Sequence, residues 1–565
     1  MNRIKIIPLG GMDEKGNSCI SLEVNEKIYI LNAGITFPTS NVLGIQGTIP
    51  DYSYFEEKKD KIAGIFIGSP YQENYGSLLQ LLKTIHSNCP VYTTSLNAVI
   101  IKTGLSVTDD KTINFSIIKP MEEIKLGNLK ITPFKVTNSL PKSVGFVFEI
   151  DEEKNVIYID NNIINITKNK FLTNDLLNIV PLIGGKQNIL LITPSGVFNN
   201  CFTSPNFTAN QYFKDLLIEN SNLRISFAFF TSDIYRIVAL LNASLSVDPR
   251  KPIYISNPGV IELLKAMSQE GYLNYDKFKF ITAQEITASD KPLLIIVDEK
   301  ECIYDTLIEI TDDEIDEISY DEKDMFVFGS STINGLEKKE ADLFDNVNRL
   351  DVAKAIKIDK KILDVVPSSE DLKFMIAFTM PKYIIPTYGL YMNFSKLEDV
   401  GIRVSKIYSE NTIIPQNGQV LVFDDFALQV EQEIIPLTPQ FVSSHGNLDS
   451  NKNSILERKQ MQSDGAVLIS FLIDKTKKRI IKNNYDVVGV TDNSEKSVKS
   501  LNVIKEETLS EFNKYVEAKI DSNELDEKDT KDFKIFIRKL ISKKFRKEFD
   551  KDPLVVTTVI FIKNK

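Results

Sequence analysis

The stretch that most constrains the fold is residues 65–77, IFIGSPYQENYGS. The apolar run 64–67 predicts a buried strand, Gly68 and Pro70 end it, and a helix is expected to begin near Gly76. A strand that turns through a polar loop into a helix is where α/β proteins place their chemistry, because backbone donors and loop side chains converge at the carboxyl end of the sheet. The side chains of this loop are therefore the first candidates for a functional site.

Composition limits the class of protein. With 565 residues, 42% of them hydrophobic and 25% charged, the chain is expected to be an ordinary globular protein of about two to four domains. No apolar run reaches membrane length, and the first residues do not read as a signal peptide. Four cysteines without a CxxC pair are typical of reduced thiols in a cytoplasmic protein. The net charge of −10 argues against a surface that binds nucleic acid everywhere, while a local basic groove stays compatible with it.

Histidine is nearly absent. The chain contains only His86 and His445. Imidazole is the usual nitrogen ligand of zinc in dinuclear hydrolases, so two histidines so far apart cannot build a histidine-rich dinuclear centre. We expect His86 to be a surface residue and His445 to lie in a polar linker.

Local patterns predict an α/β chain. Residues 18–24 and 27–31 read as a hairpin around Asn25-Glu26. From residue 206 to about 350, strands and helices alternate, which predicts a parallel sheet with crossover helices. Within that region the acid-rich stretch 298–324 is expected to be a solvated loop.

A separate α+β unit is expected after a polar linker at 438–453. A hairpin comes first, two amphipathic helices follow near 498–518 and 528–549, and a strand at 554–562 ends the unit. One face of the second helix is rich in Lys and Arg. Such a face is more often solvated than bound to nucleic acid, so we favour the former.

Three motifs carry a resemblance to a known family. IIPLGG near the start, NAGITFP after the hairpin, and PSSEDLKFMIAFTMPKYIIPTYG at 367–389 resemble segments of the bacterial ribonuclease J enzymes, which are metallo-β-lactamase-fold nucleases of the β-CASP group. The resemblance spans nearly the whole chain and implies an α/β fold: a metallo-β-lactamase αββα sandwich, an inserted β-CASP α/β domain and a small carboxy-terminal α+β domain. The implied boundaries are 1–204 and 351–436 for the two parts of the metallo-β-lactamase-like domain, 205–350 for the β-CASP domain, 437–460 for a linker and 461–565 for the carboxy-terminal domain.

The resemblance also locates the metal positions. In the family the loop at 69–74 reads His-x-His-x-Asp-His and binds two zinc ions. Here the positions that correspond to the family's ligands hold other side chains, namely Ser69, Tyr71, Glu73, Asn74, Asn138, Asn161 and Tyr388. A one-residue slip in register would put Asp160 in place of Asn161.

Amides, hydroxyls and phenols carry no charge to hold zinc, so no metal and no other cofactor is expected. The carboxylate of Glu73 has at most Asp160 as a partner. Two oxygen ligands fall short of a zinc cage, which leaves weak Mg²⁺ or Mn²⁺ binding with water as the alternative. Tyr71, Tyr75, Tyr235 and Tyr388 are expected to cluster near these positions, where they would fill space as core or stack on bases.

The resemblance further implies candidates for contact with RNA or phosphate. FFTSDIYRI resembles a β-CASP motif in which Tyr235 replaces a histidine and the arginine is kept, whereas Val366 replaces a histidine of a Gly-His-Gly-Ser motif. The candidates are Ser195, Ser232, Arg236, Ser368 and Ser369. For the last two, a role as helix caps is the favoured alternative.

The hypothesis that follows is a catalytically degenerate ribonuclease J paralogue in the cytoplasm. It would be a non-catalytic structural or RNA-positioning subunit beside an active ribonuclease J paralogue, in RNA processing and mRNA decay. The carboxy-terminal domain would assemble the homo- or hetero-oligomer, as it does in the family. Two alternatives stay open: an active ribonuclease, 5′ exonuclease or endonuclease, with an altered or relocated site, and a free-standing RNA-binding scaffold.

Overall fold

The chain folds into two compact units. The computed structural model describes residues 3–37, 45–86, 88–107, 112–164, 172–198, 209–300, 302–312, 314–315, 317–333, 335–358, 365, 367–405, 411–429, 433–443, 448–449, 452–474, 479–491, 494–520 and 527–562. The larger unit comprises 1–39 and 47–442, and the smaller one comprises 40–46 and 443–565. Cys201, Val366 and His445 lie outside the described residues.

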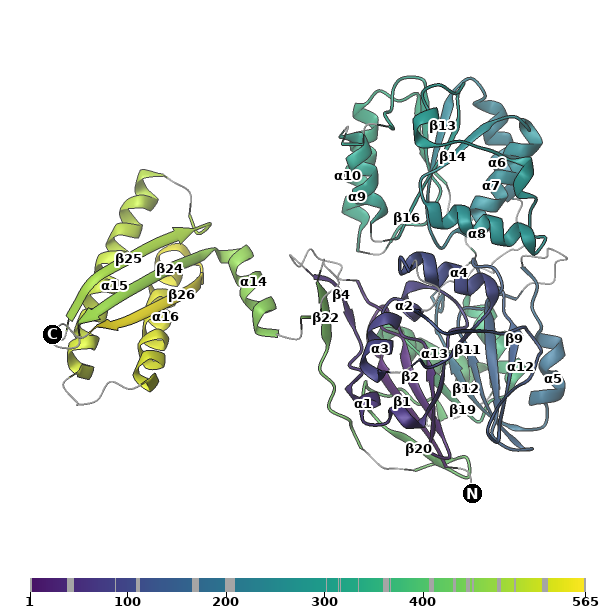
Figure 1. The fold of residues 1–565 in the computed structure, drawn as a ribbon, viewed down its shortest axis with the longest axis horizontal. Helices are drawn as coiled ribbons and strands as arrows, with labels where there is room; N and C mark the ends of the chain where they lie inside the picture. The colour runs from purple at the N-terminus through teal and green to yellow at the C-terminus, as the bar shows by residue number, and fades with distance from the viewer. Residues whose placement is uncertain are drawn as a thin grey trace. The chain divides into compact units, whose positions relative to one another are not determined.

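Two sheets pack face to face in the larger unit (Figure 1). The first sheet has the order β21-β20-β1-β2-β3-β5-β6-β7, with β1 (Arg3–Gly10), β2 (Cys19–Val24), β3 (Lys27–Leu31), β5 (Ile62–Phe66), β6 (Val91–Thr93), β7 (Phe115–Ile117), β20 (Leu421–Asp424) and β21 (Ala427–Leu428). The second has the order β19-β12-β11-β10-β9-β8, with β8 (Ile124–Leu126), β9 (Leu129–Lys135), β10 (Val144–Glu149), β11 (Lys154–Ile159), β12 (Gln187–Ile192) and β19 (Tyr383–Pro386).

The alternation of side chains along the strands explains the layers. Phe66 points into the space between the sheets, where its ring centroid lies 5.4 Å from that of Phe146 and 5.6 Å from that of Phe148. Its neighbour Ile65 belongs to the outer core of the first sheet. Successive residues of a strand face opposite sides, so a continuous apolar strand requires cover on both faces.

Helices supply that cover. The first sheet is covered by α1 (Ser53–Glu56), α3 (Leu78–Ile85) and α4 (Ser95–Gly104). The second is covered by α5 (Leu176–Ile183), α12 (Ser369–Thr379) and α13 (Tyr391–Ser405). The resulting order, helix–sheet–sheet–helix, confirms the predicted αββα sandwich.

Local sequence signals set two of the connections. The hairpin between β2 and β3 is confirmed, and both turn residues, Asn25 and Glu26, adopt positive φ angles of 48° and 69°. Two consecutive left-handed residues match the twist of the flanking strands. The loop after β5 leads through the short helix α2 (Gln72–Tyr75) into α3, as the strand–turn–helix pattern predicts.

A parallel sheet forms the second part of the larger unit, which contains β13, β14 and β16 in Figure 1. Its order is β15-β14-β16-β13-β17-β18, with β13 (Arg224–Phe230), β14 (Pro252–Ile255), β15 (Lys279–Phe280), β16 (Leu293–Asp298), β17 (Asp324–Phe328) and β18 (Lys354–Lys357). One face is covered by α6 (Ala209–Glu219), α7 (Ile234–Val247) and α8 (Pro258–Gln269), and the other by α9 (Ile303–Thr311) and α10 (Glu337–Arg349). The predicted parallel sheet with crossover helices is confirmed, and β18 extends it past residue 350.

The expectation of a solvated loop at 298–324 is wrong in part, because α9 occupies its middle. Ile303, Leu307 and Ile310 recur at helical spacing and are buried against the sheet. The acidic residues between them lie on the outer face, so the high charge of the stretch conceals an amphipathic helix.

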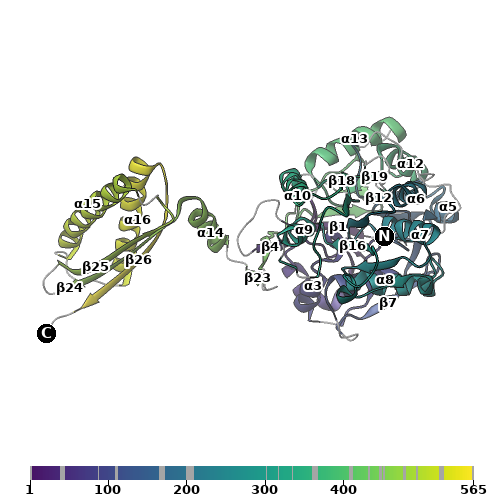
Figure 2. The ribbon, with the colours of Figure 1, turned by 90° about the horizontal axis from the view of Figure 1, so that it is seen from above.

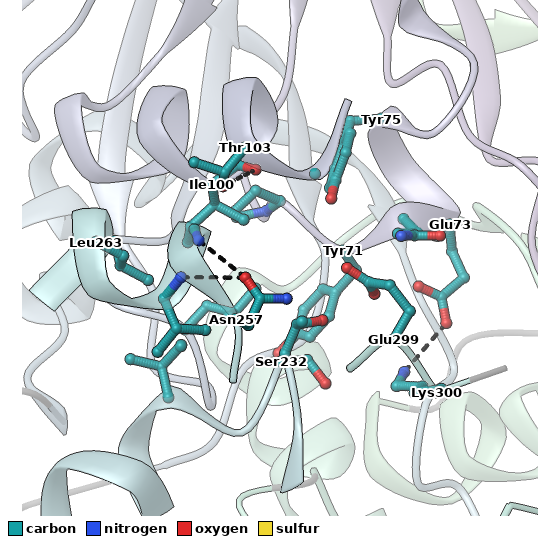
Figure 3. Close-up of a pocket in the computed structure, with 18 of the residues that line it drawn as sticks. Tyr71, Glu73, Tyr75, Ile100, Thr103, Ser232, Asn257, Leu263, Glu299 and Lys300 are labelled. Carbon is teal, nitrogen blue, oxygen red and sulfur yellow. Dashed lines mark hydrogen bonds and ion pairs between the residues drawn. The ribbon is translucent and has the colours of Figure 1, made fainter. Parts of the chain in front are cut away.

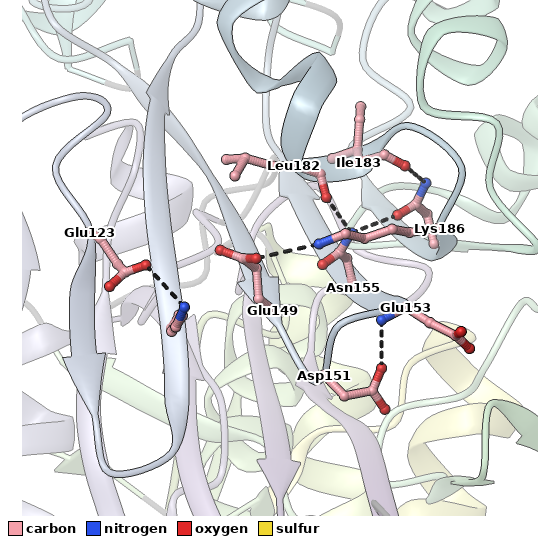
Figure 4. A network of polar contacts seen from close by, with 10 residues as sticks. Glu123, Glu149, Asp151, Glu153, Asn155, Leu182, Ile183 and Lys186 are labelled. Atoms are coloured by element: carbon pink, nitrogen blue, oxygen red, sulfur yellow. Dashed lines mark hydrogen bonds and ion pairs between the residues drawn. The ribbon is translucent and has the colours of Figure 1, made fainter.

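A polar network ties α5 to the amino-terminal ends of β11 and β12 (Figure 4). Asn155 donates to the carbonyl oxygen of Leu182 over 3.0 Å and to the side-chain oxygen of Asn188 over 3.1 Å. Nearby, Lys186 lies 3.4 Å from the carboxylate of Glu149. These contacts satisfy carbonyl groups at the end of α5, which also contains Pro181.

The smaller unit is an α+β fold (Figure 2). It contains the sheet β25-β24-β26, with β24 (Ala466–Asp474), β25 (Arg479–Val488) and β26 (Leu554–Ile562), and the helices α14 (Lys452–Asp464), α15 (Glu495–Ile520) and α16 (Glu527–Phe549). The predicted hairpin, two long helices and final strand are confirmed, whereas α14 begins within the predicted linker 437–460. Three short strands lie where the chain passes between the units: β4 (Ile45–Ile49), β22 (Gln440–Ser443) and β23 (Leu448–Asp449).

Among the residues that the structure describes, no helix is both long enough and apolar enough to cross a membrane.

One ion pair, with a buried carboxylate and a half-buried guanidinium, fixes the start of β13. Arg224 donates to both carboxylate oxygens of Asp324, over 2.6 Å each. Replacing Arg224 by Met is expected to lower the free energy of unfolding by about 3 kcal/mol, because Asp324 would stay buried without its cation. The matched control is Arg349→Met, which breaks the exposed pair with Asp345 and is expected to cost less than about 1 kcal/mol. Urea unfolding of both variants measures the difference, and equal losses would contradict it.

Candidate functional site

A cavity of about 320 Å³ lies where strands of both parts of the larger unit end. Tyr71 follows β5, Ser232 follows β13 and Lys300 follows β16. The residues around it that bear on function are Tyr71, Glu73, Ser139, Asn161, Ser195, Ser232, Asp233, Arg236, Lys300, Ser331, Thr332 and Tyr388. Convergence of loops at the carboxyl ends of strands is the usual position of a site in an α/β protein.

Asn74 is the centre of a hydrogen-bond network beneath this cavity. Its amide nitrogen donates to a carboxylate oxygen of Asp160 over 2.6 Å and to the carbonyl oxygen of Ser69 over 2.9 Å. Its amide oxygen accepts from Asn32 over 3.1 Å. The same nitrogen of Asn32 lies 2.6 Å from the hydroxyl of Tyr158. Asn74 therefore joins the loop after β5 to the ends of β3 and β11.

Asn138 has its side chain fully engaged. Its nitrogen donates to the hydroxyl of Ser69 and to the carbonyl oxygen of Asn161, over 3.2 Å each. Its oxygen accepts from the backbone of Leu140 at 2.9 Å and from the hydroxyl of Ser143 at 3.0 Å. An asparagine has two donors and one acceptor oxygen, so this set leaves no donor for another group.

Asp160 is the buried carboxylate of the network, with 2% of its surface exposed. Besides the bond from Asn74, it accepts from the hydroxyl of Thr193 over 2.8 Å. Burial raises the pKa of Asp160 to about 6, although the hydrogen bonds from Thr193 and Asn74 oppose that shift and the nearby charge of Glu73 adds to it. Asn161, at the other register, lines the cavity instead.

Tyrosine hydroxyls fill much of the space between these groups. The hydroxyl of Tyr71 lies 3.0 Å from that of Ser139, and burial raises the pKa of both Tyr71 and Tyr388. The predicted tyrosine cluster forms only in part. Tyr71 and Tyr388 line the larger cavity, whereas Tyr75, buried in the core beside the first sheet, and Tyr235 are not among its lining residues.

An ion pair crosses the site between its two parts. Lys300, after β16, places its ammonium 3.2 Å from the carboxylate of Glu73 and 5.7 Å from the centre of the Tyr71 ring. Figure 3 shows this pair at the edge of a second cavity, of about 220 Å³. Tyr71, Glu73, Ser232 and Lys300 line both cavities, so they form the wall between them.

The candidates for phosphate contact fall into two groups. Ser195 and Ser232 line the larger cavity, and so does Arg236. Arg236 is 4% exposed, however, and its guanidinium lies 3.1 Å from Asp233. Its charge is therefore already balanced within the protein.

Ser368 and Ser369 lie at the start of α12. The hydroxyl of Ser368 accepts from the backbone nitrogen of Asp371 over 3.3 Å and donates to the carboxylate of Asp371 over 2.7 Å. Together with the backbone bond from Ser368 to that carboxylate, this is a capping box. The cap uses the hydroxyl that the prediction assigned to phosphate, and contact with RNA at this position stays a prediction.

The donor set does not fit a dinuclear zinc centre. Among the described residues, no group of three or more His, Cys, Asp and Glu side chains comes together in a way that could hold a metal ion. His86 is exposed at the end of α3. At two positions that the resemblance assigns to metal ligands, Asn74 and Asn138 point amide donors at oxygen atoms, which is the opposite polarity to that of a metal ligand.

Sequence reasoning missed Asn32, Thr193 and Lys300. Asn32 stands out in the sequence only as part of the NAGITFP motif, and its partner Tyr158 lies 126 positions away. Lys300 was hidden in the acid-rich stretch, although its position immediately after a buried strand was a usable signal.

The topology and the site define a metallo-β-lactamase-fold protein with an inserted parallel-sheet domain. No family model matches the chain. The uncharacterized protein MG423 homolog of Mycoplasma pneumoniae is 31% identical over 570 residues, with 100% of both chains covered. Ribonuclease J2 of Bacillus subtilis is 25% identical over 85% of each chain, and Ribonuclease J of Helicobacter pylori is 24% identical over 96% of this chain and 78% of that one.

The chain belongs to the ribonuclease J family, a family of RNA-processing nucleases. Among solved structures, the metallo-β-lactamase fold protein YhfI from Bacillus subtilis covers 64% of this chain and 97% of its own. It is 7% identical with a TM-score of 0.24, too low for the superposition to add to the topology above.

The pKa of Asp160 leads to a prediction on stability. A carboxyl whose pKa rises from 3.8 to about 6 on folding favours the folded state at low pH, and this contribution is lost as the pH rises through about 6. Asp160→Asn removes the titration. Relative to this variant, the wild type should therefore lose up to about 3 kcal/mol of stability between pH 4 and 7.

Urea unfolding at several pH values measures this difference. Thr193→Val removes a donor to the carboxylate, so it should move the transition to higher pH. Parallel pH profiles for the wild type and Asp160→Asn would contradict the assignment.

Proposed function

We propose that this chain is a non-catalytic member of the ribonuclease J family, located in the cytoplasm. It serves as a structural or RNA-positioning subunit of a ribonuclease J complex in RNA processing and mRNA decay. The single observation that carries the proposal is the network around Asn74 and Asn138, two neutral side chains at positions that the resemblance assigns to metal ligands. Their amide groups donate to the carbonyl and hydroxyl oxygens of Ser69 and to the carboxylate of Asp160.

A charge argument supports this proposal. Two zinc ions bring four positive charges, which the family's site balances with carboxylates and a bridging hydroxide. A dinuclear site activates water by lowering its pKa through that charge. Here the charged groups at the network and its cavity include Asp160, Glu73 and Lys300, together with the buried pair of Arg236 and Asp233, and each has a protein partner. This arrangement supplies neither a nucleophile nor a Lewis acid for RNA cleavage.

The first alternative is an active ribonuclease with an altered or relocated site, and in its altered form the site would use the carboxylates of Glu73 and Asp160 alone. Asp160 accepts hydrogen bonds from Asn74 and Thr193 in the interior, whereas Glu73 is paired with Lys300 at the cavity. Both carboxylates would have to exchange partners before they could hold a cation. This weighs against the carboxylate-only form of the alternative.

The smaller unit supports a role in association. On β24 and β26, Leu468 lies opposite Val556 in the parallel register, and Leu472 lies opposite Ile560. Leu468, Val556 and Ile560 are 43%, 46% and 53% exposed, so this face of the sheet presents apolar side chains to solvent. We propose that this unit assembles the homo- or hetero-oligomer, with an active ribonuclease J paralogue as the partner.

The second alternative, a free-standing RNA-binding scaffold, would draw on the basic residues of α16. Lys544 is paired with Glu507 and Glu511 over 2.7 Å each, and Arg546 is paired with Asp552. Arg538, Lys539, Lys543 and Lys547 remain exposed on the helix. Part of the basic face is therefore neutralised within the unit, which favours assembly over RNA binding there.

Two measurements on the full chain test the proposal. The purified protein, incubated with 5′-monophosphorylated RNA and Mn²⁺, is expected to give no turnover above that of the Glu73→Ala/Asp160→Ala double variant. The tagged protein is expected to co-purify an active ribonuclease J paralogue from its own cells. Turnover that disappears in the double variant would support the carboxylate-only enzyme instead. Absence of any nuclease in the purified complex would favour the scaffold.

A further inference from the structure

We propose that Lys300 and Glu73 form an autoinhibitory ion pair over an anion site, in which Lys300 binds an RNA phosphate once Glu73 releases it. The inference rests on the proposed RNA-positioning role and names the regulation of the same cavity. Lys300 is the more exposed of the two cations that line this cavity, and Glu73 is an internal competitor for it.

The backbone that carries Lys300 is held firmly. Asp298, at the end of β16, accepts a bond from the hydroxyl of Thr306 over 2.6 Å and from the backbone nitrogen of Glu299 over 2.8 Å. Glu299 is half-buried and hydrogen-bonded to Thr231 and Gln72. The ammonium group of Lys300 therefore extends from a fixed point at the wall between the two cavities.

The two cations of the larger cavity differ in how they are balanced. Arg236 and Asp233 form a buried pair, and Asp233 also accepts a bond from the hydroxyl of Ser330. Lys300 and Glu73 form a pair whose side chains are 33% and 24% exposed. The first pair is buried in the interior, whereas the second is partly exposed and is therefore the one that a ligand can reach.

The surroundings suit phosphate oxygens. The hydroxyl groups that line this cavity belong to Tyr71, Ser139, Ser195, Ser232, Ser331, Thr332 and Tyr388. Hydroxyl donors beside a single ammonium group are a common setting for a nucleic-acid phosphate. A phosphodiester carries one negative charge, so its exchange for Glu73 leaves the charge balance of Lys300 unchanged.

The energies allow such an exchange. A partly exposed ion pair contributes about 0.5–1 kcal/mol, which a bound phosphate with additional hydroxyl donors can exceed. Removal of the charge of Glu73 should therefore strengthen RNA binding about two- to fivefold, by the same free energy.

Fluorescence anisotropy with a labelled single-stranded RNA tests this on the full chain. Glu73→Gln is expected to lower the dissociation constant about two- to fivefold. Lys300→Met is expected to raise the dissociation constant. It should also make the slope of log affinity against log salt concentration shallower, by the amount that corresponds to about one lost phosphate contact. The decisive comparison is the Glu73→Gln/Lys300→Met double variant, which should bind as weakly as Lys300→Met alone.

Lys142→Met is the matched control. It breaks another ion pair between the two parts of the larger unit, with Glu270, but lies away from the larger cavity. It is expected to leave RNA binding unchanged, and thermal unfolding of every variant checks that the fold is retained. A gain from Glu73→Gln that persists in the Lys300→Met background would overturn the inference, because it would reflect overall charge alone.

Two further outcomes separate this inference from the proposed function. RNA binding by the wild type that neither substitution changes would overturn the inference and leave the positioning role intact. Absence of RNA binding in all variants, or binding of an acidic peptide such as polyglutamate in place of RNA, would overturn both the inference and the positioning role. The structural role in a complex would then still be decided by co-purification.

Discussion

The hydrogen bonds of Asn74 are the constraint on which the rest of the site depends. Its amide joins the loop after β5 to Asp160 at the end of β11, and thereby links the two sheets of the sandwich at their carboxyl ends. In a zinc enzyme of this fold, metal ions perform that cross-linking. Here short-range dipoles perform it, and dipoles that point donors at oxygen atoms repel a cation instead of holding one. In this orientation the Asn74 amide stabilises the fold through hydrogen bonds and cannot at the same time hold a metal ion.

Charge near the network follows the same logic. Asp160 is retained in the interior because Asn74 and Thr193 each donate to it, although burial still raises its pKa. Glu73 is retained at the cavity because Lys300 reaches it from the parallel-sheet domain. One ammonium thus meets one carboxylate at the positions that the resemblance assigns to the metal centre. Residues that bear hydroxyl groups line the cavity, and this lining fits the proposed role in positioning RNA better than a role in cleaving it.

Local sequence patterns predict much of the fold, whereas the long-range contacts of the site could not be predicted, for physical reasons that can be named. The loop after β5, the hairpin at Asn25 and the parallel sheet follow from local patterns that the structure confirms. The partner of Lys300 does not, because Glu73 lies 227 positions away and no local pattern connects them. The helix α9 was missed because its acidic outer face outweighed the spacing of Ile303 and Leu307. Long-range pairing and composition bias are thus what limited the prediction.

The measurement that bears most directly on the site is the response of the purified full-length protein to zinc. Thermal unfolding with a chelator, and with excess Zn²⁺ after its removal, should give the same midpoint. Elemental analysis of the protein as purified should find no stoichiometric zinc. A metal that bound only the folded chain at about a hundred times its dissociation constant would add about 2.7 kcal/mol of stability. A gain in stability of that size in the presence of Zn²⁺, together with two zinc ions per chain, would contradict the central claim that neutral side chains have replaced the metal centre.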